Sequence, residues 1–461
     1  MVGLVAKYQQ YAEYKDSGVE WLEEVPADWD IIKIKHLSSV KRGASPRPID
    51  DPKFFDDNGD YAWVRIADVS ASDMYLLNTT QTMSVLGSSL SVKLEPNELF
   101  LSIAGTVGKP CINKIKACIH DGFVYFPDLK IPNKYLFYIF AGEQAYKGLG
   151  KMGTQLNLNT DTVGDIKVAL PKSKIDIQGI IDFLDHETAK TDNLIEKQQQ
   201  LIQLLKEKRQ AVISHAVTKG LNPDAPMKNS GVEWLGQVPE HWSVSRIGFH
   251  TSKIGSGKTP RGGAEVYQEE GILFLRSQNI YNDGLKVENS NSVFISDAIH
   301  EEMKSSQVQT GDILLNITGG SIGRSCLVPE GFCEANVNQH VSIIRLPKNL
   351  QKFISYLMTS TLIQEQIDAS QTGGNREGLN FEQMSKLIFC LPPELERDEI
   401  IKRIELNLDK LSGLEYKAQL AIQLMQERRT ALISAAVTGK IDVRNWQNPN
   451  KNNEKNMEFS A

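Results

Sequence analysis

The stretch LIQLLKEKRQAVISHAVTKG, residues 201–220, returns as AIQLMQERRTALISAAVTGK at residues 421–440. Identical residues recur at one constant spacing, so that Ser214, for example, returns as Ser434. Both copies have apolar residues at steps of three and four and contain no proline, which predicts a helix. A chain that carries one long helix twice is expected to consist of two copies of one unit.

A second phrase is also repeated. SGVEWLEEVPADW at 17–29 returns as SGVEWLGQVPEHW at 230–242, and both copies end in tryptophan, at Trp29 and Trp242. The repeat is therefore not confined to the helix. We interpret the whole chain as two copies of a unit of about 210–220 residues, which is far longer than the period of a solenoid.

Short apolar runs between the repeated phrases predict strands, because they are rich in β-branched and aromatic residues. YAWVRIADV (61–69) matches ILFLRSQNI (272–280), with Arg65 aligned to Arg276. Two further pairs of strands are predicted, one ending in Gly-rich turns and one in a Leu-Pro stop: residues 97–110 with 311–325, and 166–171 with 387–392. Each unit thus contains a mixed module of strands and helices, followed by a long helix with a narrow apolar seam.

The composition is typical of a soluble globular protein, with 41% hydrophobic and 23% charged residues. No apolar run approaches the roughly 20 residues of a membrane helix. The start, MVGLVAKYQQYAEYKD, does not resemble a secretory signal, so we expect a cytoplasmic location. The net charge of −6 argues against a uniformly basic nucleic-acid binder but allows a basic face on an acidic protein.

The five cysteines are too few for a disulfide scaffold, and we expect them to be thiols. Cys111 and Cys118 have the same spacing as Cys326 and Cys333. A zinc site would need two further ligands in each half, and only the first half offers a nearby histidine, His120. No metal is expected, and we interpret these cysteines as small, inward-facing strand residues.

The motif GSGKT (255–259) is similar to part of a phosphate-binding loop, but the required glycine five positions before Gly257 is replaced by Ser252. No clear strand precedes the motif, and no helical pattern follows it. The first unit has KRGASPRP (41–48) at the equivalent place. We therefore interpret both stretches as Gly-rich basic loops that approach a DNA backbone, and expect no ATP binding.

Motifs for catalysis are absent from the sequence. It contains no Asn/Asp-Pro-Pro-aromatic motif for methyl transfer to an amino group, no convincing Gly-rich cofactor loop, and no nuclease or helicase motif. We therefore expect no catalytic residues.

The two SGVEWL…P…W phrases, the two E-x-R-x-A-x-I-S-x-A-V-T helix ends and the divergent modules between them make the chain similar to the specificity subunits of type I restriction–modification enzymes. The resemblance covers nearly the whole chain. It implies a mixed α+β fold with an internal pseudo-two-fold repeat. Two similar α/β target recognition domains, separated by two long antiparallel coiled-coil helices, would each read one half of a bipartite double-stranded DNA target.

The resemblance also implies partners. Two modification (methyltransferase) subunits would dock on the helices, and restriction (translocase/nuclease) subunits would complete the enzyme. S-adenosylmethionine, ATP and Mg²⁺ would be bound by those subunits, and this chain would bind no cofactor.

On this basis we divide the chain into seven segments. They are an N-terminal segment (1–29), recognition domain one (30–172), a helical region (173–220), a linker that repeats the N-terminal phrase (221–240), recognition domain two (241–393), a second helical region (394–440) and a disordered tail (441–461).

DNA contacts are predicted from residue type and place, since Arg and Lys bind guanine edges or phosphates and Asn and Gln can read adenine. The candidates in domain one are Lys41, Arg42, Arg47, Arg65, Lys109, Lys151 and Gln155; those in domain two are Lys258, Arg261, Arg276, Gln278, Asn279, Arg324 and Arg376. The alternative for each is a solvated surface side chain, and the matched Arg65 and Arg276 could equally form structural ion pairs. The matched loops 151–159 and 373–380 either clamp the DNA backbone or simply connect elements.

Residues of the helix seam are predicted to pack between helices or against a partner: Leu205, Arg209, Val212, Met425, Arg429 and Leu432. We expect the two arginines to pair within the chain. Three alternative functions stay open at this point: a stand-alone DNA methyltransferase, a nucleotide-driven ATPase, and a coiled-coil adaptor without a DNA role.

Overall fold

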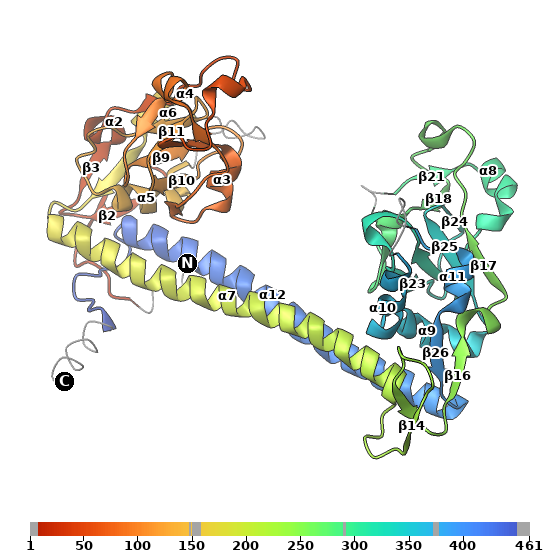
Figure 1. Ribbon diagram of the computed structural model, residues 1–461. Helices are drawn as coiled ribbons and strands as arrows, with labels where there is room; N and C mark the ends of the chain where they lie inside the picture. Colours follow the sequence, from red (N-terminus) through yellow and green to blue (C-terminus); the bar gives the residue numbers. More distant parts are fainter. Residues whose placement is uncertain (1–7, 147–148, 150–157, 289–291, 372–377, 450–461) are drawn as a thin grey trace. The chain divides into compact units, whose positions relative to one another are not determined.

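The computed structural model describes residues 8–146, 149, 158–288, 292–371 and 378–449 (Figure 1). The chain forms two compact units, one of residues 1–198 and 420–461 and the other of residues 199–419. We call them unit 1 and unit 2. Two long helices, α7 (Lys174–Lys219) and α12 (Glu394–Val437), each contribute one part to each unit.

The module of unit 1 contains two sheets of short strands. One has the order β4 (Lys41–Arg42), β12 (Phe123–Tyr125), β9 (Leu99–Ser102), β10 (Pro110–Asn113) and β6 (Tyr75–Leu76). The other has the order β7 (Thr82–Met83), β5 (Tyr61–Val64), β11 (Ala117–Ile119) and β8 (Val92–Leu94). In the second sheet β5 and β11 run parallel, with Cys118 opposite Trp63.

Among the described residues, the module of unit 2 repeats this arrangement with one strand fewer in each of the two sheets. One sheet has the order β17 (Lys253–Ser256), β25 (Val341–Arg345), β22 (Ile313–Asn316) and β23 (Ser325–Leu327), and the other β21 (Phe294–Ile295), β18 (Ile272–Leu275) and β24 (Ala335–Val337). Here β18 and β24 form the parallel pair. The internal repeat is thus present in strand topology as well as in sequence.

The predicted strands 61–69 and 272–280 are too long. β5 ends at Val64 and is followed by α3 (Ile66–Ala71), and β18 ends at Leu275 and is followed by the 3-10 helix η5 (Ser277–Asn279). The matched Arg65 and Arg276 lie at the boundary between strand and helical turn. The Asp68 carboxylate accepts a hydrogen bond from the backbone N–H of Arg65 (2.8 Å), and the Asn279 amide oxygen accepts one from that of Arg276 (2.9 Å). These caps end the strands and begin the helical turns.

The last strand of each module pairs with the strand that directly follows the Trp-Pro-Trp phrase. β13 (Lys167–Leu170) pairs antiparallel with β3 (Asp30–Lys33), and β26 (Ile388–Leu391) pairs in the same way with β16 (Ser243–Arg246). Each phrase forms a hairpin with the three residues before it, β1 (Tyr14–Asp16) with β2 (Glu24–Pro26), and β14 (Met227–Asn229) with β15 (Gln237–Pro239).

The repeated phrase and the repeated helix end contact each other, which explains why both recur. Each long helix is followed by a glycine with positive φ, Gly220 (+77°) after α7 and Gly439 (+71°) after α12. A methyl group on Gly439 would lie 2.3 Å from Pro26 Cδ, and one on Gly220 would lie 3.3 Å from the Trp242 ring. Glycine is needed for the left-handed turn and, after α12, for the close approach.

The long helices run antiparallel in both units. In unit 1 the first part of α7 shares a core with the last turns of α12, and in unit 2 the last turns of α7 share a core with the first part of α12. The predicted narrow seam is wrong for the helix ends. Ile177, Ile180, Phe183 and Leu184 are all buried, because the module as well as the other helix covers this part of α7.

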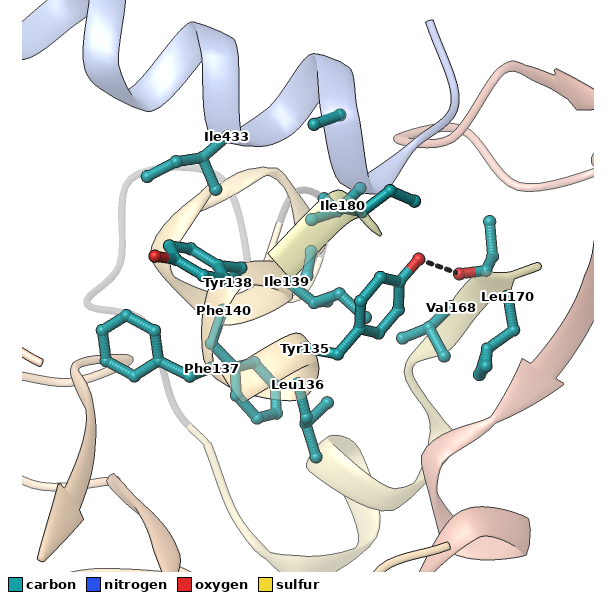
Figure 2. Close-up of a cluster of buried hydrophobic side chains, with 14 of the residues drawn as sticks. Tyr135, Leu136, Phe137, Tyr138, Ile139, Phe140, Val168, Leu170, Ile180 and Ile433 are labelled. Atoms are coloured by element: carbon teal, nitrogen blue, oxygen red, sulfur yellow. Dashed lines mark hydrogen bonds between the residues drawn. The ribbon is translucent and has the colours of Figure 1, made fainter. Parts of the chain in front are cut away.

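The core of unit 1 is built around helix α5 (Asn133–Ala141), in which all six residues from Tyr135 to Phe140 are buried. Figure 2 shows Ile433 of α12 and Ile180 of α7 beside these side chains, and the Tyr135 hydroxyl donating to the Ala169 carbonyl (3.3 Å). The module and the helices therefore form one core.

The expected disorder of the tail is wrong for its first residues. Ile441 and Val443 are buried in the core of unit 1, and the Trp446 ring packs edge-on against Phe183 at 5.5 Å. The rest of the predicted disordered segment from 450 onward lies outside the described residues.

Candidate nucleic-acid interface

The parallel strand pair of each module ends at one edge, which we call the reading edge. In module one Arg65 follows β5 and His120 follows β11; in module two Arg276 follows β18 and Asn338 follows β24. Because the carboxyl ends of parallel strands meet at the same edge of a sheet, each arginine lies near the loop that follows the neighbouring strand. Edges of this kind commonly form ligand sites in sheets with parallel strands.

The Gly-rich basic loops lie against the reading edges. A methyl group on Gly43 would lie 2.2 Å from the His120 carbonyl oxygen, and one on Gly257 would lie 1.9 Å from that of Val337. The backbone N–H groups are used inside the module, since Gly257 donates to Val341 (2.9 Å) and Lys258 to Val337 (3.1 Å). These glycines therefore allow a close approach of backbones, and the two N–H groups are not directed at a phosphate.

The expectation that no strand precedes GSGKT is wrong, because β17 ends at Ser256. The helix of a phosphate-binding loop does not follow, however, and the next helical turn is the short 3-10 helix η4 (Gly263–Val266). The exposed side chain of Lys258 remains a candidate for DNA contact.

A cleft of about 480 Å³ opens beside the reading edge of module one. Arg65 and His120, which follow the two parallel strands, both line it. It is lined by Ile49, Asp50, Pro52, Phe55, Trp63, Arg65, Gln81 and His120. The Arg65 guanidinium donates to the Thr80 hydroxyl, and its Nε lies 3.7 Å from the Asp68 carboxylate. These contacts fix the direction of a half-exposed arginine.

Two other predicted DNA contacts gather around Asp121. The Arg42 guanidinium donates to the Asp121 backbone carbonyl, and Arg47 lies 3.2 Å from its carboxylate while 81% of the Arg47 side chain stays exposed. The hydrogen bond from Ser45 and the charges of both arginines hold the pKa of Asp121 below its usual value. Burial lowers the pKa of neighbouring His120, which is therefore neutral at pH 7.

Module two has different polar side chains on its reading edge. The Thr259 hydroxyl donates to Gln339, and the Thr318 hydroxyl and His340 Nδ1 are 2.5 Å apart. Gln278 is exposed, and Arg261 is almost fully exposed, 3.7 Å from Glu302. The sequence did not point to Gln339, His340 or, in module one, Gln81, because the strand pairing that places them is formed between distant segments.

Asn279 is a wrong prediction for DNA contact. Its side chain is 2% exposed, its amide oxygen caps the turn at Arg276, and its amide nitrogen donates to the Lys286 carbonyl (3.0 Å). Both ends of the amide are occupied inside the module, so it cannot read a base.

Of the other predicted contacts, one is exposed, two are in contact with a neighbouring residue, and three cannot be placed. Lys41 is exposed, the Lys109 ammonium donates to the Ser70 carbonyl (2.8 Å), and Arg324 lies over the Tyr281 ring at 5.2 Å. Lys151, Gln155 and Arg376 lie outside the described residues.

The matched Asn159 and Asn380 cap helices. Asn159 accepts hydrogen bonds from the N–H groups of Asp161 and Thr162 at the start of α6 (Thr160–Asp165), and Asn380 accepts one from Gln383 in α11 (Phe381–Lys386). These contacts favour the connecting role for the parts of the matched loops that the structure describes.

The repeated I-S-x-A-V-T motif holds the modules on the helices. In unit 2 the Ser214 hydroxyl of α7 accepts a hydrogen bond from the Thr361 N–H (2.9 Å), at the start of α10 (Thr361–Ser370). At the equivalent place in unit 1, a methyl group on Gly142 would lie 3.4 Å from Ser434 Cα. The motif that most clearly marks the repeat therefore serves internal packing.

The predicted seam residues lie where the helices meet or beside that contact. Leu205 and Leu432 are buried, and Val212 and Met425 are half-buried. Arg429 forms an ion pair with Asp192 of α7 inside unit 1, and Arg209 donates to Ser412 of α12 inside unit 2.

In the part of the chain that the structure describes, no group of three or more His, Cys, Asp or Glu side chains is arranged to hold a metal ion. Cys111 and Cys118 are buried, and burial raises the pKa of Cys118 to about 11. Cys333 is exposed, so the prediction that it faces inward is wrong. Across the same described ranges, no helix has the length and apolar character to span a bilayer.

A family model described as the type I restriction modification DNA specificity domain matches the chain twice, over residues 26–204 and 239–424. The chain belongs to this family. The two matches cover both modules together with most of the long helices that follow them, so the repeat seen in the structure is a repeat of the family's domain.

Two specificity subunits illustrate the relation. The EcoBI specificity subunit of Escherichia coli is 26% identical over 310 residues, which are 64% of this chain and 63% of that protein. The chain thus spans just under two thirds of the EcoBI subunit. The MjaIX specificity subunit of Methanocaldococcus jannaschii is 22% identical over 455 residues, 95% of this chain and 99% of that protein.

A similar fold is found in a solved structure, described as the structural basis of complex assembly and conformational transition of the type I R-M system. A chain of that structure is similar with a TM-score of 0.65, at 12% identity, over 90% of this chain and 99% of its own length.

Proposed function

We propose that this chain is the DNA specificity subunit of a type I restriction–modification complex, in which each module reads one half of a bipartite target. The observation that carries the proposal is the repeated reading edge: one strand arrangement presents Arg65, Gln81 and His120 in one module and Arg276, Gln339 and His340 in the other. Equal scaffolds with different polar side chains will select different bases.

The helices are proposed to set the gap between half-sites and to dock two modification subunits. In unit 1, Leu194 of α7 and Leu424 of α12 are exposed; in unit 2, Leu414 of α12 and Leu204 of α7 are exposed. These leucines stand at equivalent positions of the repeat, so each unit offers the same apolar contact to a partner. Two identical partners fit such a pair of sites.

Catalysis is proposed to reside in partner subunits. S-adenosylmethionine would be bound by the modification subunits, and ATP and Mg²⁺ by the complete enzyme with its restriction subunits. This proposal is supported by the sequence, which lacks a methyl-transfer motif and has its GSGKT glycine packed against a carbonyl. The family match favours neither a stand-alone methyltransferase nor an adaptor without a DNA role.

The test is an exchange of module one in the assembled complex. Residues 30–172 are replaced by the corresponding domain of another specificity subunit, and methylated sites are mapped in the DNA of cells that carry the complex. One half of a split target should change, while the other half and the gap stay the same. A change in both halves, or methylation without a split target, would contradict the proposal.

A further inference from the structure

Helices α4 (Val85–Ser89) and α8 (Asp297–Glu302) are equivalent elements of the two modules (Figure 1). α4 follows β7, which pairs antiparallel with β5; α8 follows β21, which pairs antiparallel with β18. Each begins at a serine whose hydroxyl accepts a hydrogen bond from the first turn, Ser84 from Gly87 and Ser296 from Ile299. The two helices therefore allow a comparison position by position.

The exposed faces of these helices have opposite chemistry. In α4 the exposed side chains include Val85 (89%), Leu86 (49%) and the capping Leu90 (49%). At the equivalent positions, 212 residues later, α8 has Asp297, Ala298 and Glu302, all exposed. A short surface helix thus needs no apolar residues here, because module two forms the same helix with acidic ones. Three apolar side chains on one exposed face indicate a contact surface.

The face is held rigidly. The Ser84 N–H donates to the Phe54 carbonyl (2.9 Å), and the Ser84 hydroxyl donates to that of Lys53 (2.8 Å). A methyl group on Gly87 would lie 2.2 Å from the Phe54 carbonyl oxygen, so the backbone of α4 is in direct contact with the 3-10 helix η1 (Pro52–Phe54). The apolar side chains are presented on a fixed platform.

Acidic side chains surround this platform. The segment that follows η1 has exposed carboxylates at Asp56, Asp57 and Asp60, and Asp51 is paired with Lys53 at 2.7 Å. A DNA phosphate backbone would be repelled here, whereas a protein surface with basic side chains around an apolar pocket would be complementary.

We propose that the α4 face of module one, formed by Val85, Leu86 and Leu90, docks a protein subunit of the assembled enzyme through an apolar pocket bordered by Lys and Arg. The inference rests on the proposed function, because it assumes that assembly. Module two lacks the apolar residues, so the contact is made by one module and gives the quasi-symmetric chain a single asymmetric site.

The experiment uses the complex assembled by co-expression with its modification and restriction subunits. A photo-cross-linking residue is placed at Val85, and in a matched control at Asp297 of α8. In parallel, Val85→Asp and Leu90→Glu are combined, which gives α4 the residues that α8 carries at these positions. Phe249→Asp, which changes an exposed apolar residue of module two, is the control for the substitution.

The expected result is a cross-link from position 85, and not from 297, to an apolar and basic segment of a partner subunit. The double variant should bind that subunit about ten-fold or more weakly, a change of about 1.4 kcal/mol, with an unchanged DNA target and circular dichroism. A cross-link from position 85 to DNA, to a second copy of this chain or to nothing would overturn the inference. Binding of specific DNA is measured separately. A wild-type complex that binds no specific DNA would contradict both the proposed function and this inference. A normal DNA target without the cross-link would contradict the inference alone.

Discussion

Arg429 of α12 lies 2.8 Å from the Asp192 carboxylate of α7, and the equivalent Arg209 of α7 donates to Ser412 of α12. The partner positions 192 and 412 are 220 residues apart, as are the two arginines. Each arginine therefore contacts the position on the other helix that the repeat makes equivalent. The internal repeat therefore extends to individual side-chain contacts, with a carboxylate in unit 1 and a hydroxyl in unit 2.

A double-mutant cycle should measure the ion pair of unit 1. Both side chains are partly exposed, so water screens the pair, and we expect a coupling of about 0.2–1 kcal/mol between Arg429→Ala and Asp192→Ala. The measurement is urea unfolding at low salt and again at about 1 M salt, where the Debye length is about 3 Å and the coupling should disappear. The same cycle at Arg209 and Ser412 is the control, because a hydroxyl carries no charge and its coupling should hardly change with salt. A coupling in unit 1 that salt leaves intact would show that packing, and not charge, joins the two residues.

The hydroxyl of Ser214 should stabilise unit 2. Ser214→Ala removes the acceptor for the Thr361 N–H at the start of α10, and the loss of such a cap costs about 0.5–2 kcal/mol. Ser434→Ala is the matched control in unit 1, where the close approach to Gly142 involves the serine backbone, and it should change the free energy of unfolding by less. Urea midpoints of the two variants give the comparison. Equal losses would mean that both hydroxyls have the same role.

The long helices and the repeat could be predicted from the sequence because their signals are local or exact. Apolar residues at helical steps predict α7 and α12, and the identity of two phrases predicts two units. The contact between the repeated phrase and the helix end could not be predicted, since Pro26 and Gly439 are in contact although they lie near opposite ends of the sequence.

The candidate site was only partly predictable. Matched position favoured Arg65 and Arg276, whereas residue type suggested Asn279, whose role as a buried cap is visible only in three dimensions. Gln81 and His120 join Arg65 because β5 pairs parallel with β11, and such long-range pairing leaves no local pattern. The disorder predicted for the tail rests on its polar composition. Ile441 and Val443 are nevertheless buried, and two apolar residues in a polar segment give too weak a signal to predict this.

Module one should lose stability as the pH falls from 7 to 5. Burial puts the pKa of His120 in the folded chain below its ordinary value of 6.5. The unfolded chain then takes up the proton first, so the stabilisation is present above pH 6.5 and is lost progressively below it. Asp121, whose pKa is also lowered, should contribute only at lower pH, around and below 3.8. His120→Asn introduces the amide side chain that module two has at the equivalent position, Asn338. This variant should reduce the pH dependence of the unfolding free energy. His215→Asn, at an exposed position of α7, is the control. An unchanged pH profile for His120→Asn would assign the titration to another group.

Arg65 is predicted to contact a base, and Arg47 a phosphate. Arg65 is held by Thr80 and lines the cleft at the reading edge, whereas the Arg47 side chain, paired with Asp121, is largely exposed to solvent. In the assembled complex, Arg65→Ala should cost about 1–3 kcal/mol of specific binding and relax one position of one half-site. Arg47→Ala should weaken binding to all sequences alike and lower the salt slope of binding by about one.

The comparison needs a check on folding and on the other module. Binding is measured against a set of single-base variants of the target at several salt concentrations, and thermal unfolding is recorded for each variant. Arg276→Ala should relax one position in the other half-site and leave the half read by module one unchanged. If Arg65→Ala instead lowers thermal stability and weakens binding equally at every position, its bond to Thr80 and its proximity to Asp68 are structural, and base reading in module one must rest on Gln81 and the other residues of the cleft.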